Sequence, residues 1–334
     1  MVNLNIRSCY CLVVFILLFF GIHYTADWEN YEYFILNPEV CPDYLYRYFV
    51  YIFSNYEIGY GFLFKIHVLL MALVYVFLAR LIIAIPEISI IYAIEIYLLM
   101  ANQIRFYLAW PLMLLAIYVF YRKKYILFII LSVISVLSHQ ATAIVIVVVL
   151  VCDFVFRRLS FGKFLCLLLS LSAFLTFFIC FCLDDERINH YKMLHSQATI
   201  LGGMWNELPF VICILIVARI HNIVLSVRPY VCNDIKYRYL FCLSMSVVLF
   251  LGVGFYLQTC IQRYVESMLL IWMMYIIYCY RIIQIKRFKM EFIQLFFIVI
   301  GISPIFSLLY YVLTGKDYSI DELIKMFSSY NIFM

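Results

Sequence analysis

The feature that most constrains this chain is the repetition of apolar runs of about the length needed to cross a lipid bilayer. A helix needs about 20 mostly apolar residues to span the hydrocarbon core, and such runs follow one another along most of the 334 residues. Only 13% of the residues are charged and 67% are hydrophobic, whereas a soluble domain of this length needs far more charge to cover its surface. The sequence therefore predicts an integral membrane protein.

We expect one all-α integral membrane domain over residues 1–334, a polytopic bundle of about eleven transmembrane helices. The apolar runs place these helices at residues 8–24, 58–79, 88–101, 106–121, 125–138, 141–156, 162–183, 207–227, 238–257, 264–281 and 290–313. The first run resembles a signal peptide, but the residues after it lack the small side chains of a cleavage site, so we expect this helix to be retained. Two longer segments, 25–57 and 184–206, are expected to be external loops.

The basic residues predict the orientation of the bundle. Lys and Arg accumulate in cytoplasmic loops of membrane proteins. With a cytoplasmic N-terminus and eleven crossings, most of the Lys and Arg residues, including the run Arg122–Lys124, fall in cytoplasmic segments. The basic residues behind the net charge of +5 then serve to orient the helices in the membrane, and we expect no nucleic-acid partner. The twelve cysteines contain no CxxC pair and no Cys/His zinc spacing, so we expect neither a metal site nor another cofactor.

Five polar residues stand at the external ends of the predicted helices: Asp27, Glu57, Arg105, His139 and Arg263. Each has a structural interpretation when taken singly, because a carboxylate stabilises a helix N-terminus and an arginine can extend to lipid headgroups. Taken together, two guanidinium groups, an imidazole and two carboxylates at one depth suit a substrate that carries a diphosphate. Arginine binds phosphate oxygens in a bidentate manner, and a carboxylate or imidazole can accept a proton from a hydroxyl nucleophile.

The order of these residues along the chain resembles that of a known family. The matching motifs are Asp27 after the first helix, the sequence Glu57-Ile58-Gly59-Tyr60-Gly61, the sequence Asn102-Gln103-Ile104-Arg105, the pair Ser138-His139 and the pair Arg263-Tyr264. This order over residues 1–281 resembles the EpsG family of bacterial exopolysaccharide proteins, which includes Wzy-type O-antigen and capsule polymerases. The family usually has proline where this chain has Ile58, which removes a rigid residue of the first helical turn but leaves the Glu57 carboxylate and the glycine in place.

The resemblance implies a glycosyltransferase of the multi-helix GT-C kind in the bacterial inner (plasma) membrane, active on its external, periplasmic face. It would join oligosaccharide repeat units carried on undecaprenyl diphosphate, in contact with membrane lipids and alongside a chain-length regulator and a flippase. The residues implied as catalytic are Asp27, His139 and Glu57, with Asp27 favoured as the base and His139 as its rival. Arg105 and Arg263 would bind the diphosphate. The supporting residues would be Asn102, Tyr60, Tyr264 and Gln262.

Two alternatives remain at this point. A flippase or exporter of lipid-linked oligosaccharides would use a similar number of helices, but such transporters commonly have internal repeats and broken helices at the bilayer midplane, and no repeat is visible here. An O-antigen ligase is closer in chemistry. The long external loop expected of a ligase is not clearly present in residues 184–206.

Overall fold

A computed structural model describes residues 6–56, 58–182, 200–256, 258–283 and 320–333. These residues are helical or in turns and contain no strand. The chain divides into two compact units, the first formed by residues 1–147 with 311–334 and the second by residues 148–310.

The predicted all-α polytopic bundle is confirmed. Five helical stretches are long and apolar enough to cross a membrane: Tyr60–Ile83, Ile104–Tyr121, Glu207–Val227, Ile235–Gly254 and Arg263–Ile283. Shorter apolar helices cover Ile6–Phe20, Tyr125–Ser138, Thr142–Phe156 and Phe161–Phe177. The predicted run 290–313 lies outside the described residues, and each of the other predicted runs overlaps a described helix.

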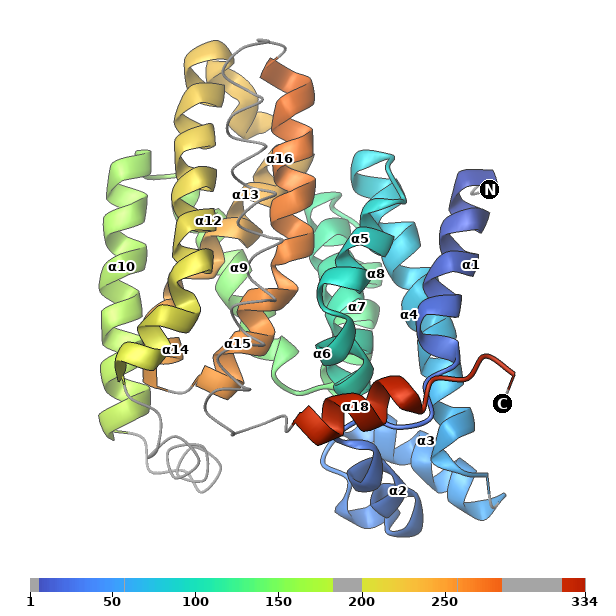
Figure 1. The fold of residues 1–334 in the computed structure, drawn as a ribbon. Helices are drawn as coiled ribbons and strands as arrows, with labels where there is room; N and C mark the ends of the chain where they lie inside the picture. Colours follow the sequence, from blue (N-terminus) through green and yellow to red (C-terminus); the bar gives the residue numbers. More distant parts are fainter. Residues whose placement is uncertain (1–5, 57, 183–199, 257, 284–319, 334) are drawn as a thin grey trace. The chain divides into compact units, whose positions relative to one another are not determined.

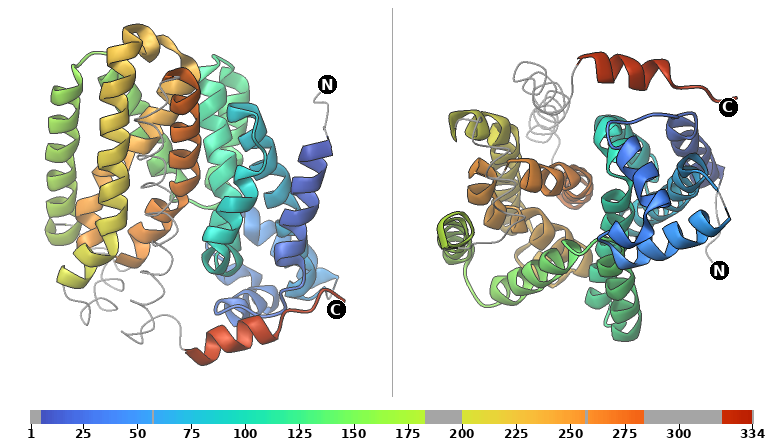
Figure 2. Two further views of the ribbon diagram at one scale, coloured as in Figure 1. Left: turned by 45° about the horizontal axis from the view of Figure 1, so that its top comes forward. Right: turned by 90° about the horizontal axis from the view of Figure 1, so that it is seen from below.

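The first unit is built around two long apolar helices, α4 (Tyr60–Ile83) and α7 (Ile104–Tyr121). In chain order the helices that accompany them are α1 (Ile6–Phe20), α5 (Ile88–Glu95), α6 (Tyr97–Asn102) and α8 (Tyr125–Ser138). α4 contacts both α1 and α7, and α7 lies along α8 (Figures 1 and 2). α7 is buried along nearly its whole length because it lies at the centre of this arrangement, whereas α8 exposes many of its apolar side chains.

The segment between α1 and α4 is itself helical. Residues 25–57 contain α2 (Trp28–Leu36), the short 3-10 turn η1 (Pro38–Val40) and α3 (Tyr44–Asn55). One face of each helix buries aromatic side chains, Trp28 and Tyr31 in α2 and Tyr46 and Phe53 in α3, whereas other tyrosines of these helices are exposed. α2 and α3 therefore form a small cap at the end of the first unit where α4 and α7 begin (Figure 1).

The last described helix, α18 (Ile320–Ser328), lies at the same end of the first unit (Figure 1). The backbone N–H of Asn331 donates to the carbonyl of Gly21 over 2.7 Å, just after α1 ends. A Cβ atom at Gly21 would lie 2.9 Å from the ring of Tyr330, so this close approach requires glycine. Residues near the start and near the end of the chain are therefore in direct contact.

The second unit consists mainly of long helices, and the boundary between the units falls within α9 (Thr142–Phe156). The remaining elements are α10 (Phe161–Phe177), the π-helical turn η2 (Phe178–Cys182), α12 (Ile200–Val227), η3 (Pro229–Asn233), α13 (Ile235–Ser246), α14 (Val248–Tyr256), α15 (Gln258–Ser267) and α16 (Leu269–Ile283). Buried Asp153 of α9 pairs with Arg157 and, over 2.8 Å, with Arg238 of α13. Asp234 caps α13 by accepting from two of its first backbone amides.

Candidate functional site

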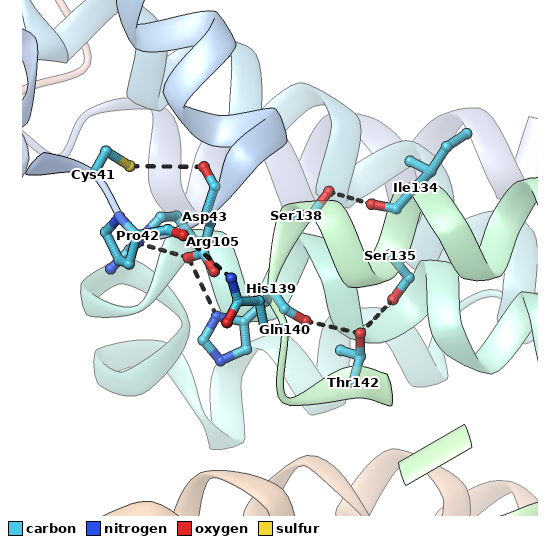
Figure 3. A network of polar contacts seen from close by, with 10 residues as sticks. All are labelled: Cys41, Pro42, Asp43, Arg105, Ile134, Ser135, Ser138, His139, Gln140 and Thr142. Atoms are coloured by element: carbon cyan, nitrogen blue, oxygen red, sulfur yellow. Dashed lines mark hydrogen bonds and ion pairs between the residues drawn. The ribbon is translucent and has the colours of Figure 1, made fainter. Parts of the chain in front are cut away.

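A compact ionic cluster lies at the end of the first unit that carries α2 and α3. Its centre is Asp43, whose Oδ2 lies 2.7 Å from Nη1 of Arg105 and 3.5 Å from Nδ1 of His139 (Figure 3). Asp43 immediately precedes α3, Arg105 is in the first turn of α7, and His139 follows α8. Three elements far apart in the sequence thus bring a carboxylate, a guanidinium and an imidazole together. We call these three residues the Asp43 cluster.

The position of Asp43 follows from the local sequence. Aspartate is favoured at the residue before a helix because its carboxylate can accept from the first backbone amides. Here the carboxylate makes no such bond among the described residues and contacts Arg105 and His139 instead. The backbone carbonyl of Asp43 still accepts from the amide of Arg47 over 2.8 Å. The side chain of Gln140 donates to the carbonyl of Pro42 over 3.4 Å, which ties this turn to the one that holds His139.

The turn after α8 is held by hydroxyl groups beneath His139. The hydroxyl of Thr142 donates to the carbonyl of His139 over 2.8 Å, and the hydroxyl of Ser135 lies 3.1 Å from the hydroxyl of Thr142 (Figure 3). Ser135 is also 2.9 Å from the carbonyl of Ala109 in α7. Ser135 and Thr142 are fully buried. The imidazole therefore projects from a turn that is fixed to the rigid α7–α8 pair.

Arg105 lies in an aromatic setting. Its guanidinium carbon is 5.4 Å from the ring centre of Tyr31, 5.2 Å from that of Phe34 and 5.4 Å from that of Tyr46. Cation–π contact with such rings is worth about 0.5–2 kcal/mol per ring, more where water is excluded. The Arg105 side chain is 19% exposed, and its Nε has no hydrogen-bond partner within the described part of the chain. The guanidinium is thus held in place, and its Nε–H group can still donate a hydrogen bond.

The electrostatics of the cluster favour an ionised carboxylate. Burial by itself would raise the pKa of Asp43, but the adjacent His139 and the charge of Arg105 outweigh burial, and the pKa of Asp43 lies below its ordinary value. At neutral pH the cluster therefore contains a carboxylate that neutralises one cation. The imidazole beside it faces a fixed negative charge.

Several sequence-predicted residues lie around this cluster. Asp27 stands before α2, is half-buried, and its backbone N–H donates to Oδ1 of Asn102 over 2.6 Å. Tyr60, the first residue of α4, is buried, and its ring stacks on Tyr31 at 4.9 Å between centroids. Since Tyr31 also contacts Arg105, these side chains form one continuous aromatic and polar layer.

The other predicted site residues lie outside the described residues or belong to the second unit. Glu57 lies outside the described residues. Arg263 and Tyr264 belong to α15 of the second unit, where the hydroxyl of Tyr264 is 2.7 Å from that of Ser246 in the buried interior. Gln262 lies in the same helix, and its side chain is outside those described. Joint binding of one diphosphate by Arg105 and Arg263 stays a prediction.

Sequence reasoning missed Asp43. It stands in a segment expected to be a loop and containing several acids, and nothing in the spacing of those acids marks it out. One available signal is Pro42-Asp43 in front of a run with buried positions 46, 50 and 53, because this pattern is typical of a helix start followed by one apolar face.

Two further acids that sequence reasoning did not single out are buried in the second unit. Glu207 of α12 is fully buried, and neither of its carboxylate oxygens has a hydrogen-bond partner within the described residues. Glu266 of α15 is 4% exposed. Across the described residues, no three His, Cys, Asp or Glu side chains lie close enough together to hold a metal ion.

Fold and site together define a polytopic helical membrane protein with an ionic cluster at one end of its first unit. The chain belongs to the EpsG family, because the family model matches residues 6–325, nearly its whole length. This match continues beyond residue 281, where the motif resemblance ends, and reaches the first part of α18. No curated protein and no solved structure gives a significant match. Membership of this family gives the protein a polysaccharide-polymerase-like role in a membrane.

Proposed function

We propose that this protein is a glycosyltransferase that polymerises oligosaccharide repeat units carried on undecaprenyl diphosphate. The observation that carries the proposal is the Asp43 cluster in a chain of the EpsG family. A GT-C-like architecture in the bacterial inner membrane, with a chain-length regulator and a flippase acting alongside, belongs to the same proposal.

The proposed reaction needs two kinds of group. The bond between the anomeric carbon of the growing chain and its diphosphate oxygen breaks, and a bond to a hydroxyl oxygen of the next repeat unit forms. The hydroxyl proton passes to a base, and undecaprenyl diphosphate leaves as an anion. A cation must stabilise the leaving group, and a proton acceptor must activate the hydroxyl.

Arg105 is the cation that we assign to the diphosphate. A guanidinium presents five N–H donors in a planar fork that matches phosphate oxygens. The Asp43 contact and the three aromatic rings fix its position before substrate binds, so little reorganisation is needed. Arg263, in the second unit, is proposed as the other diphosphate ligand.

His139 is the base that the geometry favours over Asp27. Its Nδ1 faces the Asp43 carboxylate at 3.5 Å, a distance typical of catalytic contacts that tighten when substrate binds. A carboxylate beside Nδ1 orients the ring and stabilises the imidazolium that forms when Nε2 accepts the proton. Asp43 then acts as a positioning residue for both His139 and Arg105. Asp27 stays the rival base, and Glu57 is retained only from the family pattern.

The distribution of charge in the first unit supports an external location for the cluster. The basic residues Arg7, Arg80, Arg122, Lys123 and Lys124 lie where α1 begins, where α4 ends and between α7 and α8. These positions are at the opposite end of the unit from the cluster (Figure 1). Because basic residues accumulate on the cytoplasmic side, the cluster would face the periplasm.

The proposal is tested by deleting the gene and examining the surface polysaccharide by gel electrophoresis. A polymerase deletion leaves single repeat units and removes the ladder of longer chains. Restoration of the ladder by the wild-type gene is the control. Complete loss of surface repeats, with lipid-linked units retained on the cytoplasmic side, would instead indicate a flippase, whereas full-length polymer that is not attached to its acceptor would indicate a ligase.

A further inference from the structure

Residues 320–332, which we call the C-terminal strap, lie against the end of α1 within the first unit. The carbonyl of Gly21 accepts from the backbone amide of Asn331 over 2.7 Å. Nε2 of His23 donates to the carbonyl of Asn331 over 3.1 Å, and the hydroxyl of Tyr330 donates to a backbone carbonyl of α1. These polar contacts fix the strap to the segment that links α1 to the α2–α3 cap.

The helix of the strap, α18, adds contacts with aromatic rings. The ammonium group of Lys325 lies 3.7 Å from the ring centre of Tyr24, close enough for cation–π attraction. Phe327 stacks on Tyr97, the first residue of α6, with 6.4 Å between ring centroids and 15° between ring planes. The strap therefore contacts both the segment after α1 and the start of α6 (Figure 1).

Both of the contacted segments lead directly to residues of the candidate site. Three residues after Tyr24 comes Asp27, whose backbone N–H donates to Oδ1 of Asn102 over 2.6 Å. Asn102 is the last residue of α6, and Arg105 lies in the first turn of α7. Since α6 is a helix of only six residues, a shift at Tyr97 also moves Asn102. The strap thus touches the elements that carry both partners of the Asp27–Asn102 hydrogen bond.

Gly21 makes the close approach of the strap possible. A Cβ atom at this position would lie 2.9 Å from the ring of Tyr330 and 3.1 Å from the carbonyl carbon of Asn331. The backbone of Gly21 is outside the left-handed region, so other residues can adopt its conformation. A larger side chain at this position therefore acts by pushing the strap away rather than by straining its own backbone.

We propose that the C-terminal strap is a positioning element of the candidate site. It holds the segment after α1 and the short helix α6 so that Asp27 meets Asn102 and α7 begins where Arg105 reaches the Asp43 carboxylate. The strap acts through these residues and not by contact with substrate. Its expected effect on polymerisation rests on the proposed function, whereas its effect on the Asp27–Asn102 hydrogen bond does not.

Hydrogen exchange of the full-length protein in detergent tests the structural part of the proposal. Gly21→Val should displace the strap and accelerate exchange of the Asp27 amide at least about fivefold, the factor that corresponds to one ordinary hydrogen bond. Gly162→Val is the matched control, because a Cβ atom at Gly162 would meet no other atom within 4 Å. Phe327→Ala should act in the same direction as Gly21→Val, whereas Phe333→Ala removes a ring that is 96% exposed and should have no effect.

The polymerisation rate of the same purified variants tests the functional part. Gly21→Val and removal of residues 320–334 should each lower the rate at least about tenfold, since small displacements of a site are costly. The two changes together should lower the rate no further than either change alone, because both remove the same contact. Asn102→Ala should make the protein less sensitive to Gly21→Val for the same reason. Such non-additivity separates positioning from a general loss of stability.

Unchanged exchange of the Asp27 amide in Gly21→Val would overturn the proposal. Additive effects of Gly21→Val and of the truncation on the rate would also overturn it. If the truncated chain does not fold, Gly21→Val and Phe327→Ala decide. A wild type that joins no repeat units would contradict the proposed function alone, and the exchange of Asp27 would still decide whether the strap positions this part of the first unit.

Discussion

At the scale of single residues, Asp43 joins the other two members of the proposed site. One of its oxygens contacts both Arg105 and His139, and the residue is almost fully buried. A buried ion pair is weak in net terms, but removal of one partner leaves the other charge buried without compensation. Asp43 therefore links the stability of the α2–α3 cap to the chemistry of the cluster.

We expect Asp43→Asn to destabilise the purified protein by about 3 kcal/mol, because Arg105 loses its carboxylate in a largely buried setting. Thermal unfolding in detergent measures this loss, and Glu29→Gln, an exposed change in the same cap, is the matched control. Addition of Arg105→Gln should recover part of the loss, as expected for a coupled pair. Equal effects of Asp43→Asn and Glu29→Gln would contradict the assignment.

The pH dependence of stability follows from the same carboxylate. The pKa of Asp43 is below its ordinary value in the folded protein, so its stabilising contribution is complete above the unfolded pKa of about 4 and disappears as the pH falls through the folded pKa. The difference in unfolding temperature between the wild type and Asp43→Asn should shrink as the pH falls below about 4, where the carboxylate becomes protonated. A difference that grew as the pH fell below about 4 would show that the sign is wrong.

At the scale of elements, the long apolar runs were predictable and the cap was not. A run of about 20 apolar residues has few alternatives to a transmembrane helix. Residues 25–57 are rich in tyrosine and acids, which gave no such signal, and were expected to be a loop. They form α2 and α3 because one face of each helix buries aromatic rings, an arrangement that depends on contacts with α4 rather than on local hydropathy.

Substitutions of Tyr31 test whether the α2–α3 cap holds the Asp43 cluster in position. Its ring lies between Tyr60 and Arg105, so Tyr31→Ala should loosen α2 and lower polymerisation at least tenfold at equal protein level. Tyr31→Phe keeps the ring but removes the hydroxyl that interacts with Arg105, so it should lower polymerisation less than Tyr31→Ala does. Polysaccharide ladders from cells expressing each variant provide the measurement. Full activity of Tyr31→Ala would show that the cap plays no part in positioning.

At the scale of the whole molecule, the site residues are divided between the two units. Sequence reasoning placed Arg105, His139 and Arg263 at the same depth from the topology alone. The structure adds the bridge through Asp43 in the first unit and shows that Arg263 belongs to the second. Asp43 lies about 60 positions from Arg105 and about 100 positions from His139 in the sequence, and no local sequence pattern predicts contacts over such separations.

We expect the buried carboxyl group of Glu207 in the second unit to lower the free energy of unfolding, because neither of its oxygens has a hydrogen-bond partner among the described residues. Glu207→Gln should leave the free energy of unfolding unchanged or increase it by up to about 1 kcal/mol, as measured by thermal unfolding. Glu39→Gln, which changes an exposed acid, is the control for altered net charge. A clear loss of stability in Glu207→Gln alone would mean that the carboxylate has a stabilising partner.

The most direct test of the central claim is the rate at which the purified protein joins lipid-linked repeat units in the Arg105→Lys variant. Lysine keeps the positive charge but not the planar fork, so the bidentate contact with the diphosphate is lost. We expect the rate to fall roughly 100-fold, the order of magnitude for the loss of one well-placed donor in a transition state. An unchanged rate in correctly folded Arg105→Lys would contradict the assignment of the Asp43 cluster as the catalytic site.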